Sequence, residues 1–123
     1  MSKTAKTRWL SKPTKDDYRA ARSYLSLLYD ERRVATSCFR LKNARVVWYK
    51  AEDVIRASGL SLLGLSDDHV KKERKRVRSG QRLAPVLLVK DPRSARLVIA
   101  DGYHRLCAVH ACDENIVVPC KIA

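Results

Sequence analysis

The residues best suited to chemistry in this chain lie in one short segment, from Asp101 to Arg105. The apolar residues 97–100 before it predict a strand, and residues 103–112 after it predict a helix. The first N–H groups of a helix have no partners inside that helix, and the helix dipole places positive charge at the same end. A neighbouring glycine lets a ligand approach the backbone closely. The segment therefore predicts an anion-binding strand–turn–helix.

The order of charges in this predicted helix supports the same interpretation. Helices favour acidic residues in the first turn, yet His104 and Arg105 occupy it here. Each misplaced cation costs about 0.3–1 kcal/mol, and a bound anion reverses the sign of that interaction. The residues predicted to bind phosphate are Gly102, Tyr103, His104 and Arg105. In the alternative interpretation, Asp101 caps the helix and pairs with one of the two cations.

A second candidate is a basic helix predicted from Ser66 to Ser79 and ended by Gly80. Its cations are Lys71, Lys72, Arg74, Lys75, Arg76 and Arg78. Acidic residues precede them, as the helix dipole favours, so helix stability explains part of the pattern. The crowded cations repel one another, and a phosphate backbone relieves that repulsion. The pattern is equally consistent with contact to a polyanion and with a solvated helix face.

The composition favours an anionic partner. The chain has 123 residues, with 26 Lys and Arg against 13 Asp and Glu, for a net charge of +13. Such a charge attracts nucleic acids, nucleotides and acidic membrane surfaces. No apolar run approaches the roughly 20 residues of a membrane span, and no secretion signal is recognisable, so we expect a cytoplasmic protein that is not embedded in a membrane.

The cysteines predict neither a metal site nor disulfides. Cys38, Cys107, Cys112 and Cys120 form no C-x-x-C pair and show no zinc-type spacing. In the cytosol they are expected to be reduced, and cysteine is among the most buried residue types. We therefore expect them to fill the core.

The remaining pattern predicts one α+β domain in three parts. Residues 1–13 are basic and predict a flexible arm, and residues 14–44 predict a helical hairpin with Thr14 as its first N-cap. Residues 45–123 predict a mixed sheet with flanking helices. Strands are expected at 45–50, 85–90, 96–100 and 116–122, and helices at 51–58, 66–79 and 103–112. Pro119 indicates that the last strand lies at an edge or contains a bulge.

The segment Val-Ile-Ala-Asp-Gly-Tyr-His-Arg-Leu-Cys-Ala at residues 98–108, followed by Val-Val-Pro-Cys at 117–120, resembles the ParB/sulfiredoxin superfamily. Gly102-x-x-Arg105-x-x-Ala108 is similar to the phosphate motif of ParB N-terminal domains. The stretch from Asp101 to Arg105 is also similar to the motif of sulfiredoxins and of ParB-fold free-serine kinases.

The resemblance covers roughly residues 45–123 and implies a small α+β fold whose loop and helix end hold nucleotide phosphates. ATP, ADP or CTP with Mg²⁺ is then the expected cofactor. Tyr103 stands where sulfiredoxins have a cysteine, so their thiol chemistry is not expected. Partition ParB proteins continue into a helix-turn-helix and a dimerisation domain, so a complete partition protein is not expected either.

Three functions follow, of which nucleic-acid association ranks first. A ParB-like binder or nuclease fits the net charge, and hydrolysis would require carboxylates such as Asp101 with Asp91, Glu52 or Asp53 to hold a divalent metal. The second function is a nucleotide-dependent small-molecule kinase resembling the serine kinases, with Glu52 or Asp53 as the base. The third is a non-catalytic nucleotide-sensing module.

Overall fold

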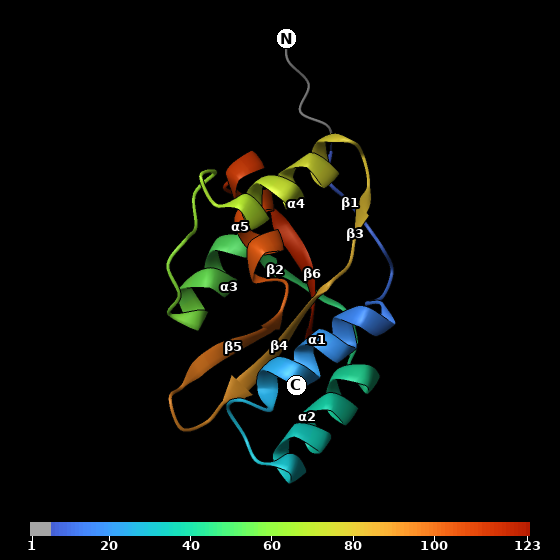
Figure 1. Cartoon of the computed structure of the whole chain (residues 1–123), viewed down its shortest axis with the longest axis vertical. Coiled ribbons are helices and arrows are strands. Elements are labelled where there is room, and N and C mark those ends of the chain that lie inside the picture. The colour runs from blue at the N-terminus through green and yellow to red at the C-terminus, as the bar shows by residue number, and fades with distance from the viewer. Residues whose placement is uncertain (1–5) are drawn as a thin grey trace.

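A four-stranded mixed sheet lies at the centre of the structure, between two groups of helices (Figure 1). The computed structural model describes residues 6–123. In spatial order the strands are β2 (Val47–Lys50), β6 (Val117–Ile122), β4 (Val86–Asp91) and β5 (Arg96–Asp101). Strand β6 is parallel to β4, whereas the other two pairs are antiparallel. A smaller parallel sheet joins β1 (Arg8–Trp9) to β3 (Arg82–Leu83).

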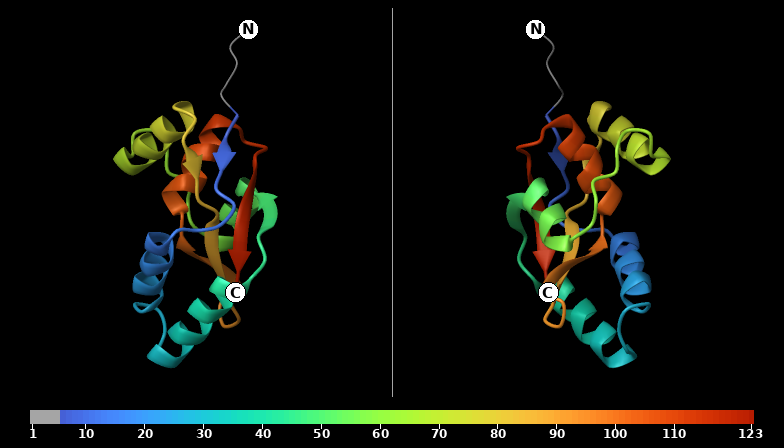
Figure 2. Two further views of the ribbon diagram at one scale, coloured as in Figure 1. Left: turned by 90° about the vertical axis from the view of Figure 1, so that its right-hand side faces the viewer. Right: turned by 90° about the vertical axis from the view of Figure 1, so that its left-hand side faces the viewer.

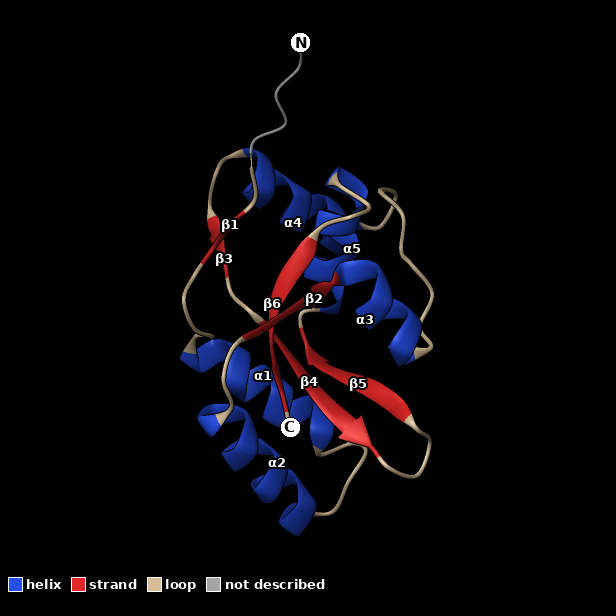
Figure 3. Ribbon diagram, turned by 180° about the vertical axis from the view of Figure 1, so that it is seen from behind, coloured by secondary structure: helices blue, strands red, loops and turns tan. Residues whose placement is uncertain are grey.

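The helices cover both faces of the larger sheet. They are α1 (Lys15–Leu25), α2 (Glu31–Asn43), α3 (Ala51–Ser58), α4 (Asp68–Arg78) and α5 (Tyr103–Cys112). Helices α1 and α2 lie side by side at one end of the molecule, and α4 and α5 lie at the other (Figures 2 and 3). The prediction of an α+β chain with a mixed sheet and flanking helices is confirmed.

The alternation of side chains along β4 builds two cores, one on each face of the sheet. Leu87 and Val89 pack against α1 and α2, whereas Val86 and Leu88 pack against α3 and α5. Successive strand residues point to opposite faces, so an uninterrupted apolar strand requires a cover on both. The helical hairpin at 14–44 is therefore one of the layers that bury the sheet.

Side-chain caps begin three of the helices. Thr14 and Asp17 form a capping box at the start of α1, and Asp30 and Asp67 accept N–H donors at the starts of α2 and α4. Helix α3 ends at Gly59, whose φ of 73° lies in the left-handed region. These local signals explain why the helices begin and end close to the predicted positions.

Two sequence predictions need correction. Strand β6 is central rather than at an edge, because β2 pairs with residues 117–120 and β4 with residues 120–122. Pro119 is tolerated because β6 is paired only with β2 at this position. No hydrogen bond to β4 therefore requires the N–H that proline lacks. The predicted flexible arm is also partly wrong, since Arg8–Trp9 pairs with β3 and Trp9 packs against the core. Residues 1–5 of that arm lie outside the described residues.

All four cysteines are free thiols, as expected, and Cys107 and Cys120 are buried. Burial raises the pKa of Cys120 to about 12, which keeps this thiol protonated and unreactive. Among residues 6–123, no helix has both the length and the apolar character needed to cross a membrane.

Candidate functional site

The N-terminus of α5 has the backbone geometry that the motif predicts. Gly102 is its N-cap, with a φ of 104° and no capping side chain. A β-carbon at this position would lie 2.5 Å from Cγ1 of the buried Val86, so both the φ angle and the space require glycine. In the first hydrogen bond of the helix, the Leu106 N–H donates to the Gly102 carbonyl at 2.9 Å. The N–H groups of the first turn precede that bond and face the front of the helix.

The side chain of Arg105 is occupied by the protein itself. One guanidinium nitrogen donates to the carbonyls of Ala84, at 2.9 Å, and Pro85, at 3.3 Å. The other lies 3.3 Å from the Asp17 carboxylate and 3.6 Å from that of Asp101. The Arg105 side chain is only 11% exposed. A phosphate at the helix front reaches this guanidinium only by displacing internal partners.

These contacts decide between the two interpretations of the charge order. Asp101 pairs with Arg105, as the alternative interpretation proposed. Asp101 does not cap the helix, however, because the N-cap is Gly102. The unfavourable position of Arg105 at the positive end of α5 is offset by its pairing with Asp17 and Asp101, so no bound anion is needed to explain it.

Asp17 is the member of this cluster that sequence analysis missed. Its Oδ2 accepts from the N–H and the hydroxyl of Thr14, at 2.7 and 2.8 Å, and its Oδ1 faces Arg105. The local pattern explained Asp17 fully as part of a capping box. Nothing in the sequence pointed to a second role, because Arg105 lies 88 residues further along the chain.

The pKa of Asp101 is raised to about 7 in this cluster. Burial is the largest cause, since it penalises the charged carboxylate. The Arg105 guanidinium acts in the opposite direction, and the nearby Asp17 carboxylate adds to the increase. Helix α1 and the start of α5 are thus joined by two carboxyl groups that share one guanidinium.

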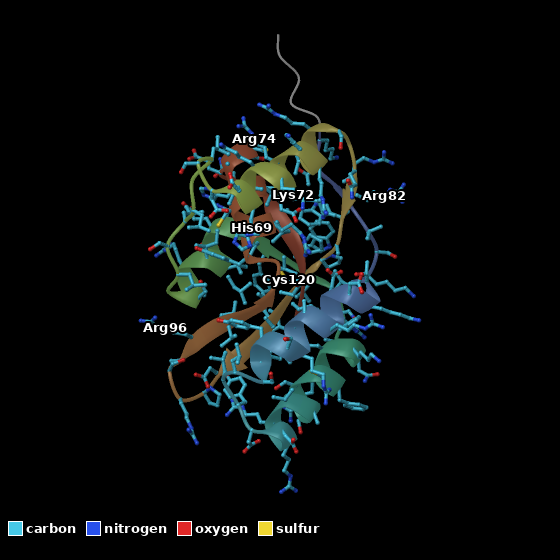
Figure 4. All side chains as sticks on the ribbon, in the orientation of Figure 1. His69, Lys72, Arg74, Arg82, Arg96 and Cys120 are labelled. Atoms are coloured by element: carbon cyan, nitrogen blue, oxygen red, sulfur yellow. The ribbon has the colours of Figure 1, made fainter. Side chains whose placement is uncertain are left out.

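The other two residues of the predicted phosphate site lie at the junction of α5 and α4. The ring of the half-buried His104 lies 4.8 Å from that of His69 on α4 and 5.4 Å from that of Tyr103. The Tyr103 hydroxyl donates to the Ser61 carbonyl, which ties the front of α5 to the loop before α4. Figure 4 shows His69 between the two helices. The structure therefore brings the front of α5 next to the N-terminal turn of α4.

Helix α4 presents most of its charge to solvent. Val70 and Val77 are buried, and Val70 packs against Cys107 and Ala108 of α5. The exposed cations of this helix are Lys71, Lys72, Lys75, Arg76 and Arg78, whereas Arg74 is half-buried. In the described part of the chain, the carboxylate paired with these cations is Glu73, which lies 3.5 Å from Arg76. The result is a cationic surface beside the front of α5, which we call the α4 surface.

The carboxylates predicted to be catalytic lie in separate neighbourhoods. Glu52 lies 3.8 Å from the ring of His110, and Asp53 lies 4.0 Å from Arg56. Asp101 belongs to the Arg105 cluster, and Asp91 accepts from the Ser94 hydroxyl at 2.7 Å and pairs with Arg33. Among residues 6–123, no three His, Cys, Asp or Glu side chains are grouped so as to hold a metal ion.

Comparisons of this chain with protein-family models, curated proteins and solved structures found no match. The resemblance to the ParB/sulfiredoxin superfamily therefore rests on the motif at residues 98–108 and its context, and it stays a prediction.

Proposed function

We propose that this chain associates with nucleic acid by binding phosphate groups along the α4 surface. The observation that supports the proposal most directly is the row of five exposed cations on one short helix, with a single carboxylate paired to it in the described residues. Uncompensated cations at this density attract a polyanion and release its counterions. The helix dipole favours the cations of the last turn, Lys75, Arg76 and Arg78, but it does not account for Lys71 and Lys72 nearer the N-terminus. Neighbouring like charges on a helix repel one another.

The front of α5 extends this surface. The N–H groups of its first turn and the imidazoles of His104 and His69 lie beside the α4 cations. In the proposal these groups bind one phosphate of the same nucleic-acid strand, as a domain of the ParB/sulfiredoxin kind would do. ATP, ADP or CTP presents the same phosphate oxygens and is the expected small ligand there. Arg105 is assigned a positioning role, since its partners fix α1 and the start of β4 against α5.

The experiment compares two triple variants that carry the same net charge. The test variant combines Lys71→Ala, Lys72→Ala and Lys75→Ala, three exposed residues that share one face of α4. The control combines Arg40→Ala, Lys90→Ala and Arg93→Ala, which are exposed on α2 and around the β4–β5 turn, away from α4. Binding of a labelled duplex and a labelled single strand is measured by fluorescence anisotropy over a series of salt concentrations.

We expect the test variant to bind more weakly than the control and to show a shallower dependence of log K on log salt. Each phosphate contact that is lost lowers the slope by about 0.9, so three contacts lower it by about 2.7. Equal losses in the two variants would show that only the overall charge matters, and the proposed surface would be rejected.

A further inference from the structure

A hollow that shares no residue with the α4 surface combines aromatic and cationic side chains. It has a volume of about 1020 Å³ and lies between the segment that joins β1 to α1, strand β2 and the end of β6. Its cations are Lys12, Lys15, Lys42, Arg82 and Lys121, and its aromatic residues are Trp9, Tyr18 and Trp48. In the described part of the chain, no Asp or Glu lines it. The hollow is large enough for a nucleoside phosphate.

Lys121 is the most unusual residue of this hollow. Lys121 is only 7% exposed, although an ammonium group is costly to bury without a counter-charge. Its Nζ donates to the Lys42 carbonyl at the C-terminal turn of α2, at 3.0 Å, and lies 5.7 Å from the ring of Tyr18. No carboxylate of residues 6–123 lies within 4.0 Å of it. An ammonium has three donors, and one carbonyl satisfies a single one of them.

The register of the sheet places an indole on the same side as this ammonium. Trp48 of β2 lies opposite Pro119 of β6, and Lys121 follows Pro119 by two residues. Residues two apart on a strand point to the same face, so Trp48 and Lys121 both project towards the hollow. Trp48 is 55% exposed, which leaves much of its ring free to stack on a ligand.

The second indole is held firmly in place. Trp9 lies opposite Leu83 in the β1–β3 pair, and the next N–H, that of Leu10, donates to the Leu83 carbonyl at 2.7 Å. Trp9 also packs against the main core. Both indoles also line a neighbouring hollow of about 630 Å³. Rigid aromatic side chains lose little entropy on stacking against a base.

We propose that this hollow binds a nucleotide unit, with its base stacked on Trp48 and its phosphate beside Lys121. Stacking accounts for the exposed indole, and the phosphate supplies the counter-charge that the buried ammonium lacks. The ligand is either a free nucleotide or an unpaired nucleotide of a single strand, since both present a base and a phosphate. The site does not depend on the α4 surface, because the two share no residue.

The experiment titrates the full chain with AMP, ATP, adenosine, inorganic triphosphate and a short oligothymidylate, by isothermal titration calorimetry and by indole fluorescence. Trp48→Ala is compared with Tyr49→Ala, its neighbour on the same strand. Tyr49 is 50% exposed but points to the opposite face, where it lines a different hollow. Lys121→Met keeps an unbranched side chain, one atom shorter, and removes the charge. Trp48→Phe retains an aromatic ring and serves as the conservative variant.

We expect the nucleotides or the oligothymidylate to quench the indole fluorescence. Trp48→Ala is expected to lose about 5- to 150-fold in affinity, Trp48→Phe less, and Tyr49→Ala less than twofold. Lys121→Met is expected to weaken ATP much more than adenosine. A preference for free nucleotide or for oligothymidylate identifies the source of the ligand and upholds the site in either case.

Three results would overturn the proposal. The first is the absence of binding by every base-containing phosphate, and the second is an equal effect of Trp48→Ala and Tyr49→Ala. The third is binding of inorganic triphosphate as tight as that of ATP. The α4 triple variant and its charge-matched control are titrated in parallel. Nucleotide binding that depends on Trp48 but is the same in these two variants shows that this site stands or fails separately from the α4 surface.

Discussion

Asp101→Asn tests whether Asp101 is protonated in the cluster that joins α1 to α5. In the folded protein the pKa of Asp101 is about 7, against an ordinary value of 3.8 for an aspartate. Between these pH values the folded state keeps a proton that the unfolded state has lost. Stability therefore falls as the pH rises through this range, which is the opposite of the usual behaviour of a paired carboxylate. Asparagine is neutral at every pH and has nearly the same shape, so it mimics the protonated residue.

The size of the effect follows from the same pKa. A rise from 3.8 to about 7 corresponds to a loss of about 4 kcal/mol in the free energy of unfolding once the carboxyl is ionised. The loss has this sign because burial and the Asp17 carboxylate outweigh the attraction of Arg105. We expect Asp101→Asn to match the wild type near pH 4 and to be more stable by up to about 4 kcal/mol near pH 8.

Urea unfolding curves measured from pH 4 to pH 8 provide the assay. Asp53→Asn is the matched control, because this carboxylate is exposed on α3 and, among residues 6–123, pairs only with Arg56 at 4.0 Å. Its effect on the free energy of unfolding is expected to stay within about 0.5 kcal/mol at every pH. Stability curves for the wild type and Asp101→Asn that run parallel over this range would refute the reasoning, since they would show that Asp101 is ionised throughout.

Three further predictions concern the glycines at two helix ends, the Asp17 ion pair and the reactivity of Cys120. Gly102→Ala is expected to cost about 2–4 kcal/mol, because it adds a left-handed φ and a clash with Val86. Gly80→Ala has a similar φ of 76° in open space and is expected to cost about 1–2 kcal/mol; equal losses in thermal unfolding would contradict the role of the clash. Asp17→Ala removes a capping box and a buried ion pair, so a loss of about 2–4 kcal/mol is expected in urea unfolding. The Cys120 thiol, with a pKa of about 12, is expected to resist a thiol reagent near neutral pH until the protein unfolds, and mass spectrometry of rapidly labelled native protein checks this.

Much of the fold follows from local patterns in the sequence. Thr14 begins α1 as its N-cap, as predicted, and α3 spans the predicted residues 51–58. These predictions succeed because a cap or a helix stop depends on residues within a few positions along the chain. The same reasoning failed for Pro119, because the position of a strand in a sheet depends on which distant strands pair with it.

The candidate site divides in the same way. The glycine turn, the basic helix and the reversed charge order at α5 are all readable from the sequence by itself. Only the tertiary structure shows that Arg105 already pairs with Asp17 and Asp101, and that Trp48 and Lys121 point into one hollow. Local periodicity specifies which face a side chain takes on its own element, whereas the order β2-β6-β4-β5 and the docking of α1 determine what that face meets.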